Sequence, residues 1–491
     1  MIRSPSRDLA KRLLLACALT SRIGAAQQSG GVKERPFTLE PCHLESVNGD
    51  GKCGTYWVYE DRARRAGRRI PLNVIVLPAR NGHPLPDPML LVSPGGPGTT
   101  NSESGLGIAW NNWWRNDRDV VLVDLRGTSG PNRLDCPMSG SDSHPAGYLD
   151  SLFPHDVVVH CRDELSKHAD LTKYTTPLII EDLDEVRAAL GYGKVDVWGG
   201  SWGTRAVLFY LKLHPESIRS AIIEGVAPPS LKNPLPHARA AQNGLDSLFA
   251  ACDRQPDCHG AYPTLKGDLA SVMTRLHEQP ARVIIPNGQH ADTAQLHWQQ
   301  FAEALRVMSY YVPSVITIPK VVHRAALGEL TPFALAGIAS NRGLRRQLRF
   351  GMLLSITCSE DVSRIDPTEI APATRGTYLG DSRVREQMEA CKVWPHAALP
   401  AGYGDPIRSS VPVFLLSGEW DPVSTAADGA DAAKYLSNAI HVIAPGVHVP
   451  GGPCIVNMER AFLAAASPKA VDIHCVAGMK MPPFSVDKVV P

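Results

Sequence analysis

Hydrophobic and polar residues alternate along the chain in two distinct patterns. From Leu72 onward, short β-branched runs are separated by segments whose apolar residues recur at helical spacing. The runs that predict strands read LNVIVL, PMLLVSPGGPG, DVVLVDLRG, KVDVWGGS and SAIIEGV. Between two of them IEDLDEVRAAL, residues 180–190, predicts an amphipathic helix. This alternation predicts an α/β fold, with a mainly parallel sheet covered by helices on both faces.

The pattern changes over residues 236–405, which are helical in periodicity and lack a parallel strand series; clear examples are 245–252, 265–277 and 298–311. Strand-like runs then resume with VPVFLLSGEWDP and AIHVIAP. A helical insertion between consecutive core strands is expected to cover the carboxyl edge of the sheet and to shape a substrate pocket. The predicted organisation is therefore a core over 40–235, a helical cap over 236–405, and the rest of the core over 406–480.

The first 26 residues predict a signal peptide. Basic residues precede the apolar run 13–19, and small residues end at Ala25 and Ala26. This predicts a secreted or periplasmic protein. Within the segment, LLAC at 14–17 loosely resembles a bacterial lipobox, so the alternative is a membrane-anchored lipoprotein with a lipid on Cys17. No later segment has the unbroken apolar run that a membrane span needs.

Cysteine usage also favours export. Besides Cys17 there are ten cysteines, an even number without a C-x-x-C metal knuckle, which suits disulfides in an oxidising compartment. Pairing each with its neighbour is the simplest arrangement, and in chain order they are Cys42, Cys53, Cys136, Cys161, Cys252, Cys258, Cys358, Cys391, Cys454 and Cys475. The 50 basic and 49 acidic residues give a net charge of +1, which leaves no basic surplus for binding nucleic acid.

The sequence GGSWG at 199–203 places a serine between a valine-rich strand and a helical segment. A corner this tight strains the central residue, and flanking glycines let strand and helix approach closely. This is the pattern of a nucleophile elbow, which exposes the Ser201 hydroxyl and directs the Trp202 amide N–H toward a developing oxyanion.

A serine nucleophile requires a base and an orienting acid, which follow in the chain order Ser, Asp, His. Asp421 and His448 each follow a predicted core strand, in the loops GEWDP and APGVHVPGG. We therefore expect His448 to carry the serine proton and Asp421 to orient the imidazole. A helix cap is the alternative role for Asp421. Asp428 and Asp431 are the alternative acids, although both fall within the next helical pattern.

The glycine pair in SPGGPG, residues 93–98, ends another predicted strand. Backbone N–H groups of Gly95 or Gly96 can supply the second oxyanion donor beside Trp202. The alternative is a simple glycine turn. No G-K-[ST] follows, so a nucleotide-binding loop is excluded.

Taken together, these motifs resemble the tripeptidyl-aminopeptidase-like and proline-iminopeptidase-like branch of the α/β-hydrolases. The resemblance extends from about Cys42 to Cys475 and rests on SPGGPG, VVLVDLRGTSGPNRLDC, VDVWGGSWGT, ITCSED, CKVWP, GEWDP and VHVPGGPC. It implies a serine exopeptidase that acts on peptides with a free N-terminus, without metal or cofactor. It also implies the triad Ser201, Asp421 and His448. Ser93-Pro94 stands where many iminopeptidases have His-Gly, which argues against strict proline specificity.

An exopeptidase of this kind needs acidic side chains to hold a substrate ammonium group. Glu360 and Asp361 in CSED are the candidates, followed by Glu224 after the strand SAII. A helix cap or a solvated acidic turn is the alternative role for each.

Two other functions remain open at this stage. An esterase or lactonase would use the same triad, because the cap rather than the core sets the substrate. A non-catalytic binding module would be expected to have lost a triad or oxyanion residue, and none is missing.

Overall fold

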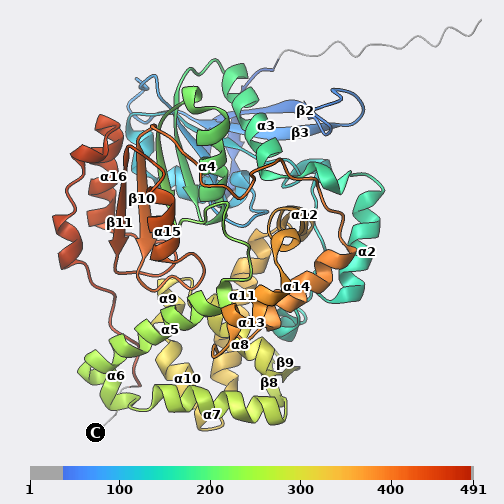
Figure 1. Cartoon of the computed structure of the whole chain (residues 1–491), viewed down its shortest axis with the longest axis vertical. Helices are drawn as coiled ribbons and strands as arrows, with labels where there is room; N and C mark the ends of the chain where they lie inside the picture. Colours follow the sequence, from blue (N-terminus) through green and yellow to red (C-terminus); the bar gives the residue numbers. More distant parts are fainter. Residues whose placement is uncertain (1–36, 488–491) are drawn as a thin grey trace, which may run out of the picture. The chain divides into compact units, whose positions relative to one another are not determined.

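The computed structural model describes residues 37–487, in which nine strands form one sheet (Figure 1). The strand order is β1-β2-β3-β5-β4-β6-β7-β10-β11. The bounds are β1 Glu40–Leu44, β2 Gly49–Tyr59, β3 Arg69–Leu77, β4 Met89–Ser93, β5 Val120–Val123, β6 Val195–Gly200, β7 Ile218–Glu224, β10 Val413–Gly418 and β11 Ala439–Ala444. Pairs from β5 to β11 are parallel, and those joining β1, β2, β3 and β5 are antiparallel. The predicted parallel core is confirmed, whereas β1 and β2 were not predicted.

The central strands are buried on both faces, which explains their nearly continuous apolar sequences. Alternate residues of β4 point to opposite sides. Leu90 and Val92 pack with α3 (Thr176–Ala189) and α4 (Trp202–Leu213). Met89 and Leu91 pack with α1 (Leu106–Asn111) and α16 (Pro453–Ala465). Helices thus cover both faces of the sheet, as the sequence predicts.

The remaining helices lie in the connections. Before β6 comes α2 (His155–Ser166), and α15 (Ala426–Ala433) links β10 to β11. The insertion between β7 and β10 contains α5 His237–Arg254, α6 Pro256–Ala261, α7 Leu265–Glu278, α8 Trp298–Met308, α9 Val312–Val315, α10 Ile318–Ala326, α11 Leu330–Gln347, α12 Phe350–Glu360, α13 Pro367–Thr374 and α14 Ser382–Val393. Figure 1 shows these helices gathered together on one side of the sheet.

The insertion has its own hydrophobic core. Phe301 of α8 and Phe333 of α11 stack with their ring centroids 3.8 Å apart, and both are fully buried. The insertion also contains an antiparallel hairpin, β8 (Ala281–Asn287) with β9 (His290–Leu296). The sequence predicted a helical insertion without a parallel strand series, and it did not indicate this antiparallel hairpin. The hairpin was missed because each of its strands buries only two residues, so it lacks the continuous apolar run of the core strands.

Five disulfides connect the cysteines in sequence order, as the simplest pairing predicts. They are Cys42–Cys53, Cys136–Cys161, Cys252–Cys258, Cys358–Cys391 and Cys454–Cys475. Such a set is typical of an oxidising compartment. Between residues 37 and 487, no helix combines the length and the hydropathy needed to cross a membrane. The predicted signal peptide and Cys17 lie outside the described residues.

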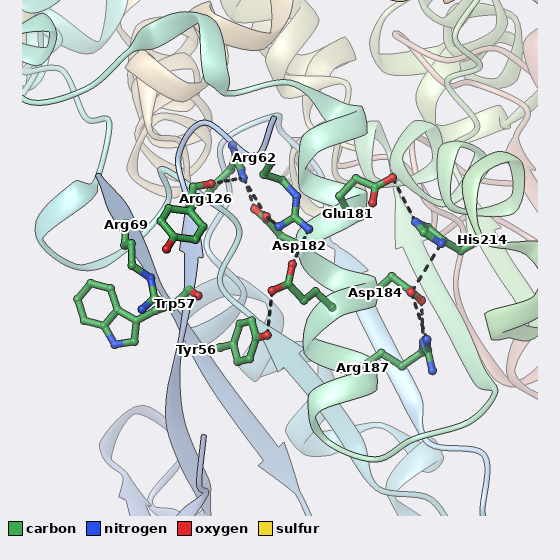
Figure 2. A network of polar contacts seen from close by, with 12 residues as sticks. Tyr56, Trp57, Arg62, Arg69, Arg126, Glu181, Asp182, Asp184, Arg187 and His214 are labelled. Carbon is green, nitrogen blue, oxygen red and sulfur yellow. Dashed lines mark hydrogen bonds and ion pairs between the residues drawn. The ribbon is translucent and has the colours of Figure 1, made fainter. Parts of the chain in front are cut away.

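A buried polar network fixes α3 against the sheet (Figure 2). Arg126 follows β5 and donates two hydrogen bonds to the Asp182 carboxylate of α3, at 2.7 and 2.8 Å. Arg62, which follows β2, donates to the same carboxylate at 2.7 Å. Because α3 packs against α4, this network also supports the helix that begins directly after Ser201.

Candidate active site

Ser201 occupies the sharp corner between β6 and α4. Its backbone has φ 53° and ψ −124°, a strained conformation for a residue with a Cβ atom. Its N–H donates to the Glu224 carbonyl oxygen at 2.8 Å, which holds the corner against β7. A Cβ atom on Gly203 would lie 2.2 Å from the Ser93 carbonyl oxygen, so only glycine fits beside this strand. The predicted elbow geometry is present at Ser201.

Asp421 and His448 meet across the ends of β10 and β11. The Asp421 Oδ2 atom lies 2.8 Å from His448 Nδ1, and both side chains are buried. The Asp421 Oδ1 atom accepts the N–H groups of Val423 and Ser424, at 2.9 and 3.0 Å. Asp421 therefore orients the imidazole while its other oxygen is held by the backbone of its own turn.

Ser201 and His448 line one cavity. Within residues 37–487 the His448 Nε2 atom has no hydrogen-bond partner, and no hydrogen bond joins it to the Ser201 hydroxyl. Such contacts are often long in an empty site and shorten when substrate binds. The Tyr310 ring lies edge-on to the imidazole, 5.1 Å between centroids, and covers its other side. The imidazole is thus oriented, and its second nitrogen remains available for proton transfer.

The glycine loop after β4 lies against the nucleophile. A Cβ atom on Gly95 would lie 3.3 Å from the Ser201 Cβ atom. The Gly95 N–H already donates to Ser93 Oγ at 3.2 Å. In the described part of the chain, the N–H groups of Gly96 and Trp202 donate no hydrogen bond. Of the two predicted glycines, Gly96 is therefore the one whose amide is available beside Trp202.

The cavity around Ser201 has a volume of about 160 Å³ and is lined from both the core and the insertion. Apolar side chains such as Phe350 and Leu353 line it together with charged ones. Residues that sequence reasoning missed are Gly225, which packs against the His448 ring, Ser424, whose Oγ lies 3.2 Å from Asp421 Oδ2, and the cavity residues His237, Glu303, Arg306, Arg345 and Arg383. No local motif marks the last five, because the insertion brings them together only on folding.

Glu360 is not among the residues that line this cavity. It is fully buried, and its carboxylate accepts hydrogen bonds from the Thr176 N–H and hydroxyl and from the Tyr403 hydroxyl. Burial raises the pKa of Glu360, which Arg205 partly offsets. This carboxylate anchors the start of α3 instead of facing the cavity.

Asp361 does line the cavity, but its carboxylate is already paired. Arg205 donates to Asp361 Oδ1 at 2.8 Å, and the Asn233 N–H donates to the same oxygen at 3.1 Å. Both charged side chains are buried. Burial raises the pKa of Asp361, and Arg205 counteracts this. A substrate ammonium at Asp361 would have to share the carboxylate with Arg205.

Glu224 is buried beside the elbow and does not line the cavity. Burial and the facing carboxyl group of Glu459 raise its pKa well above the usual range, and burial also raises the pKa of Glu459. Two carboxyl groups in contact cannot both ionise at low cost. The raised pKa values favour the protonated form of the pair, which does not suit Glu224 to holding an ammonium group.

The α/β-hydrolase fold model matches residues 88–450. The chain belongs to the α/β-hydrolase family. The serine protease Hip1 of Mycobacterium tuberculosis is 23% identical over 536 residues, covering 96% of this chain and 100% of that protein. A proline iminopeptidase of Xylella fastidiosa is 39% identical over 59 residues, 12% of this chain and 19% of the relative. A solved proline iminopeptidase of Mycobacterium smegmatis aligns with a TM-score of 0.37 at 14% identity, covering 85% of this chain and 96% of that one.

The sequence matches to the Hip1 protease and the Xylella iminopeptidase agree with the resemblance to the proline-iminopeptidase-like branch of the family. The protein is a serine hydrolase. Its fold class is the α/β-hydrolase fold that the sequence predicts.

Proposed function

We propose that this α/β-hydrolase is a secreted serine aminopeptidase that releases short peptides or single residues from free peptide N-termini. The observation that carries the proposal is the Asp421–His448 pair, whose unpartnered Nε2 atom lies in the cavity of the strained serine. The relatives named serine protease and proline iminopeptidase favour peptides as the substrates.

In the proposed mechanism, the Ser201 hydroxyl attacks the scissile carbonyl carbon while His448 Nε2 accepts the hydroxyl proton. Asp421 holds the imidazole tautomer and stabilises the imidazolium. The N–H groups of Gly96 and Trp202 would bind the oxyanion of the tetrahedral intermediate. His448 then protonates the leaving amine, and water hydrolyses the acyl-enzyme by the same route in reverse.

Residues 236–405 are proposed to act as the cap of this site. Arg306 and Tyr310, from α8 and the turn after it, line the cavity together with Ser201. An enclosed cavity of this kind limits access to chain ends, which suits an exopeptidase. The acids available for the substrate ammonium are Asp361 and Glu303, and each would have to share its carboxylate with an arginine.

We infer that the mature protein works in an oxidising compartment, after removal of residues 1–26. The five disulfides support this proposal. Expression in a bacterial host with and without residues 1–26 tests it. Export and absence of free thiols in the full-length product are expected, and a reduced product retained in the cytoplasm would contradict export.

The test of catalysis compares the wild type with Ser201→Ala, on a free-amine peptide anilide, its N-acetylated counterpart and a short acyl ester. We expect the wild type to cleave only the free-amine peptide. In Ser201→Ala the rate of this cleavage is expected to fall by at least about a thousandfold. Ser247→Ala on α5 is the matched control, because its side chain bonds only to the Asn243 carbonyl. If the enzyme hydrolyses the ester and cleaves neither peptide, the protein is an esterase or lactonase that uses the same triad. Turnover of neither class would favour a non-catalytic binding module.

A further inference from the structure

A cluster of charged side chains separates the catalytic cavity from a second cavity of about 350 Å³. The residues that line both cavities are Leu152, Glu303, Asn341, Arg345 and Arg383. The shared wall therefore carries two arginines and one carboxylate, at a place where a substrate in either cavity would meet them.

The carboxylate in this wall is already neutralised. Arg306 donates to both oxygens of Glu303, with Nε 2.9 Å from Oε2, and its third nitrogen donates to the Tyr310 hydroxyl at 2.6 Å. Its arginine neighbours also lower the pKa of Glu303 against the effect of burial, so the carboxylate is ionised. Arg345 is likewise committed, because it donates to the backbone carbonyls of the segment 139–150.

Arg383, near the start of α14, differs from Arg306 and Arg345 in its hydrogen bonding. Its side chain is 9% exposed, yet within the described residues its Nε and Nη1 atoms donate no hydrogen bond. The nearest carboxylate oxygen, Glu303 Oε1, is 3.7 Å from Nε and already accepts from Arg306. The Phe153 ring lies 5.3 Å from the guanidinium carbon. Glu386, in the second cavity, accepts from the Ser151 hydroxyl and the Phe153 N–H. A buried guanidinium with unused donors is costly, unless a ligand completes its hydrogen bonds.

His237, the first residue of α5, indicates the sign of the local charge. It is 8% exposed, it lines the catalytic cavity, and in the described part of the chain neither ring nitrogen has a partner. Burial lowers its pKa well below the usual range, and Arg306 and Arg383 lower it further. Arg306 and Arg383 therefore add positive potential to this part of the wall, which a negatively charged group would complement.

We propose that Arg383 binds a carboxylate of the substrate, so that this serine hydrolase prefers acidic peptides. The two unused donors, Nε and Nη1, lie on different edges of the planar guanidinium, and each can donate a charge-assisted hydrogen bond to a carboxylate oxygen. The carboxylate comes either from an Asp or Glu side chain or from the free C-terminus of a short peptide. The inference rests on the proposed function, and it gives Arg383 a role in substrate specificity.

The test measures kcat/KM for paired substrates that differ only in charge. One pair exchanges Glu for Gln at successive positions of a free-amine peptide anilide. The second pair is a short peptide with a free or an amidated C-terminus. We expect the acidic member of one pair to be cleaved about 10- to 100-fold more efficiently, which is the usual contribution of a hydrogen bond to a charged group. The pair that shows the preference identifies the source of the carboxylate.

In Arg383→Gln this preference is expected to disappear, and in Arg383→Lys to persist in part. Arg385→Gln is the matched control, because Arg385 lies on the same helix with its side chain 61% exposed. Each ratio is taken within one preparation, so a smaller folded fraction leaves it unchanged. Equal cleavage of both members in each pair by the wild type, or an unchanged ratio in Arg383→Gln, would overturn the proposal.

A third substrate pair separates this inference from the proposed function. The p-nitrophenyl esters of glutarate and butyrate differ in a carboxylate and require no peptidase activity. If no peptide is cleaved, a preference for the glutarate ester that is lost in Arg383→Gln still supports the carboxylate site. Equal turnover of both esters would then count against Arg383.

Discussion

The backbone N–H of Ser201 donates to the carbonyl oxygen of Glu224, whose side chain forms a buried carboxyl pair with Glu459. The backbone of the nucleophile is therefore hydrogen-bonded to a residue whose buried side chain favours its protonated form. Because burial raises the pKa of both carboxyl groups in the folded protein, the folded state binds more protons than the unfolded state above about pH 4.5. The free energy of unfolding is therefore expected to fall as the pH rises through the raised pKa values.

Replacing Glu459 by Gln removes one titrating group and leaves a hydrogen-bonding side chain. We expect Glu459→Gln to lose less stability than the wild type between pH 5 and pH 8, roughly the range above the unfolded pKa of Glu. Thermal unfolding midpoints at several pH values measure this. Glu389→Gln, at an exposed position on α14, serves as control. Identical pH slopes for wild type and Glu459→Gln would contradict a shared buried proton.

Two of the three acids that the sequence offered as partners of His448 have different surroundings in the structure. Asp421 contacts the imidazole, whereas the Asp428 carboxylate accepts the Thr425 N–H and hydroxyl and caps α15. We expect Asp421→Asn to lower kcat by about ten-thousandfold, since the amide favours the wrong imidazole tautomer. Asp428→Asn is expected to leave kcat nearly unchanged and to cost about 0.5–2 kcal/mol of stability. Steady-state kinetics with a short acyl ester compare the two, and similar losses of kcat would argue against Asp421 as the orienting acid.

The buried pair Arg205–Asp361 is expected to serve stability more than substrate binding. Asp361→Asn would remove the carboxylate that pairs directly with Arg205 in the interior, at a cost of about 3–5 kcal/mol. Urea unfolding measures this loss. Asp381→Asn, a partner in the exposed pair with Arg385, is the control and should cost little. If Asp361→Asn is as stable as the wild type and raises KM only for free-amine peptides, then Asp361 binds the substrate ammonium group.

The disulfide Cys358–Cys391 links α12, which precedes Asp361, to α14, which carries Arg383. It closes a sequence separation of 33 residues, against 6 for Cys252–Cys258. The entropy of loop closure predicts a loss of about 3–4 kcal/mol when both cysteines of the longer loop become serine, and about 2 kcal/mol for the shorter. Urea unfolding of the two double variants tests this order. A larger loss for the shorter loop would contradict it.

Much of the core could be read from local sequence. The parallel strands were predictable because residues buried on both faces, as in VFLLS of β10, must be apolar throughout. The elbow at Ser201 was predictable because close approach of strand and helix permits only glycine at 203. The disulfides were predictable in the same way, because each cysteine pairs with its neighbour in the chain. Strands β8 and β9 were not predicted because a largely exposed hairpin carries little hydrophobic signal.

The chemical groups of the triad could be predicted from local sequence, because Ser201, Asp421 and His448 each follow a core strand and parallel strands end at one edge of the sheet. The surroundings of these groups depend on tertiary packing. It paired Asp361 with Arg205, buried Glu360 against Tyr403, and left Arg383 with unused donors. The physical reason is that the charge available to a substrate depends on which groups already neutralise each other. Those partners lie far apart in the chain and meet only when the insertion packs on the core.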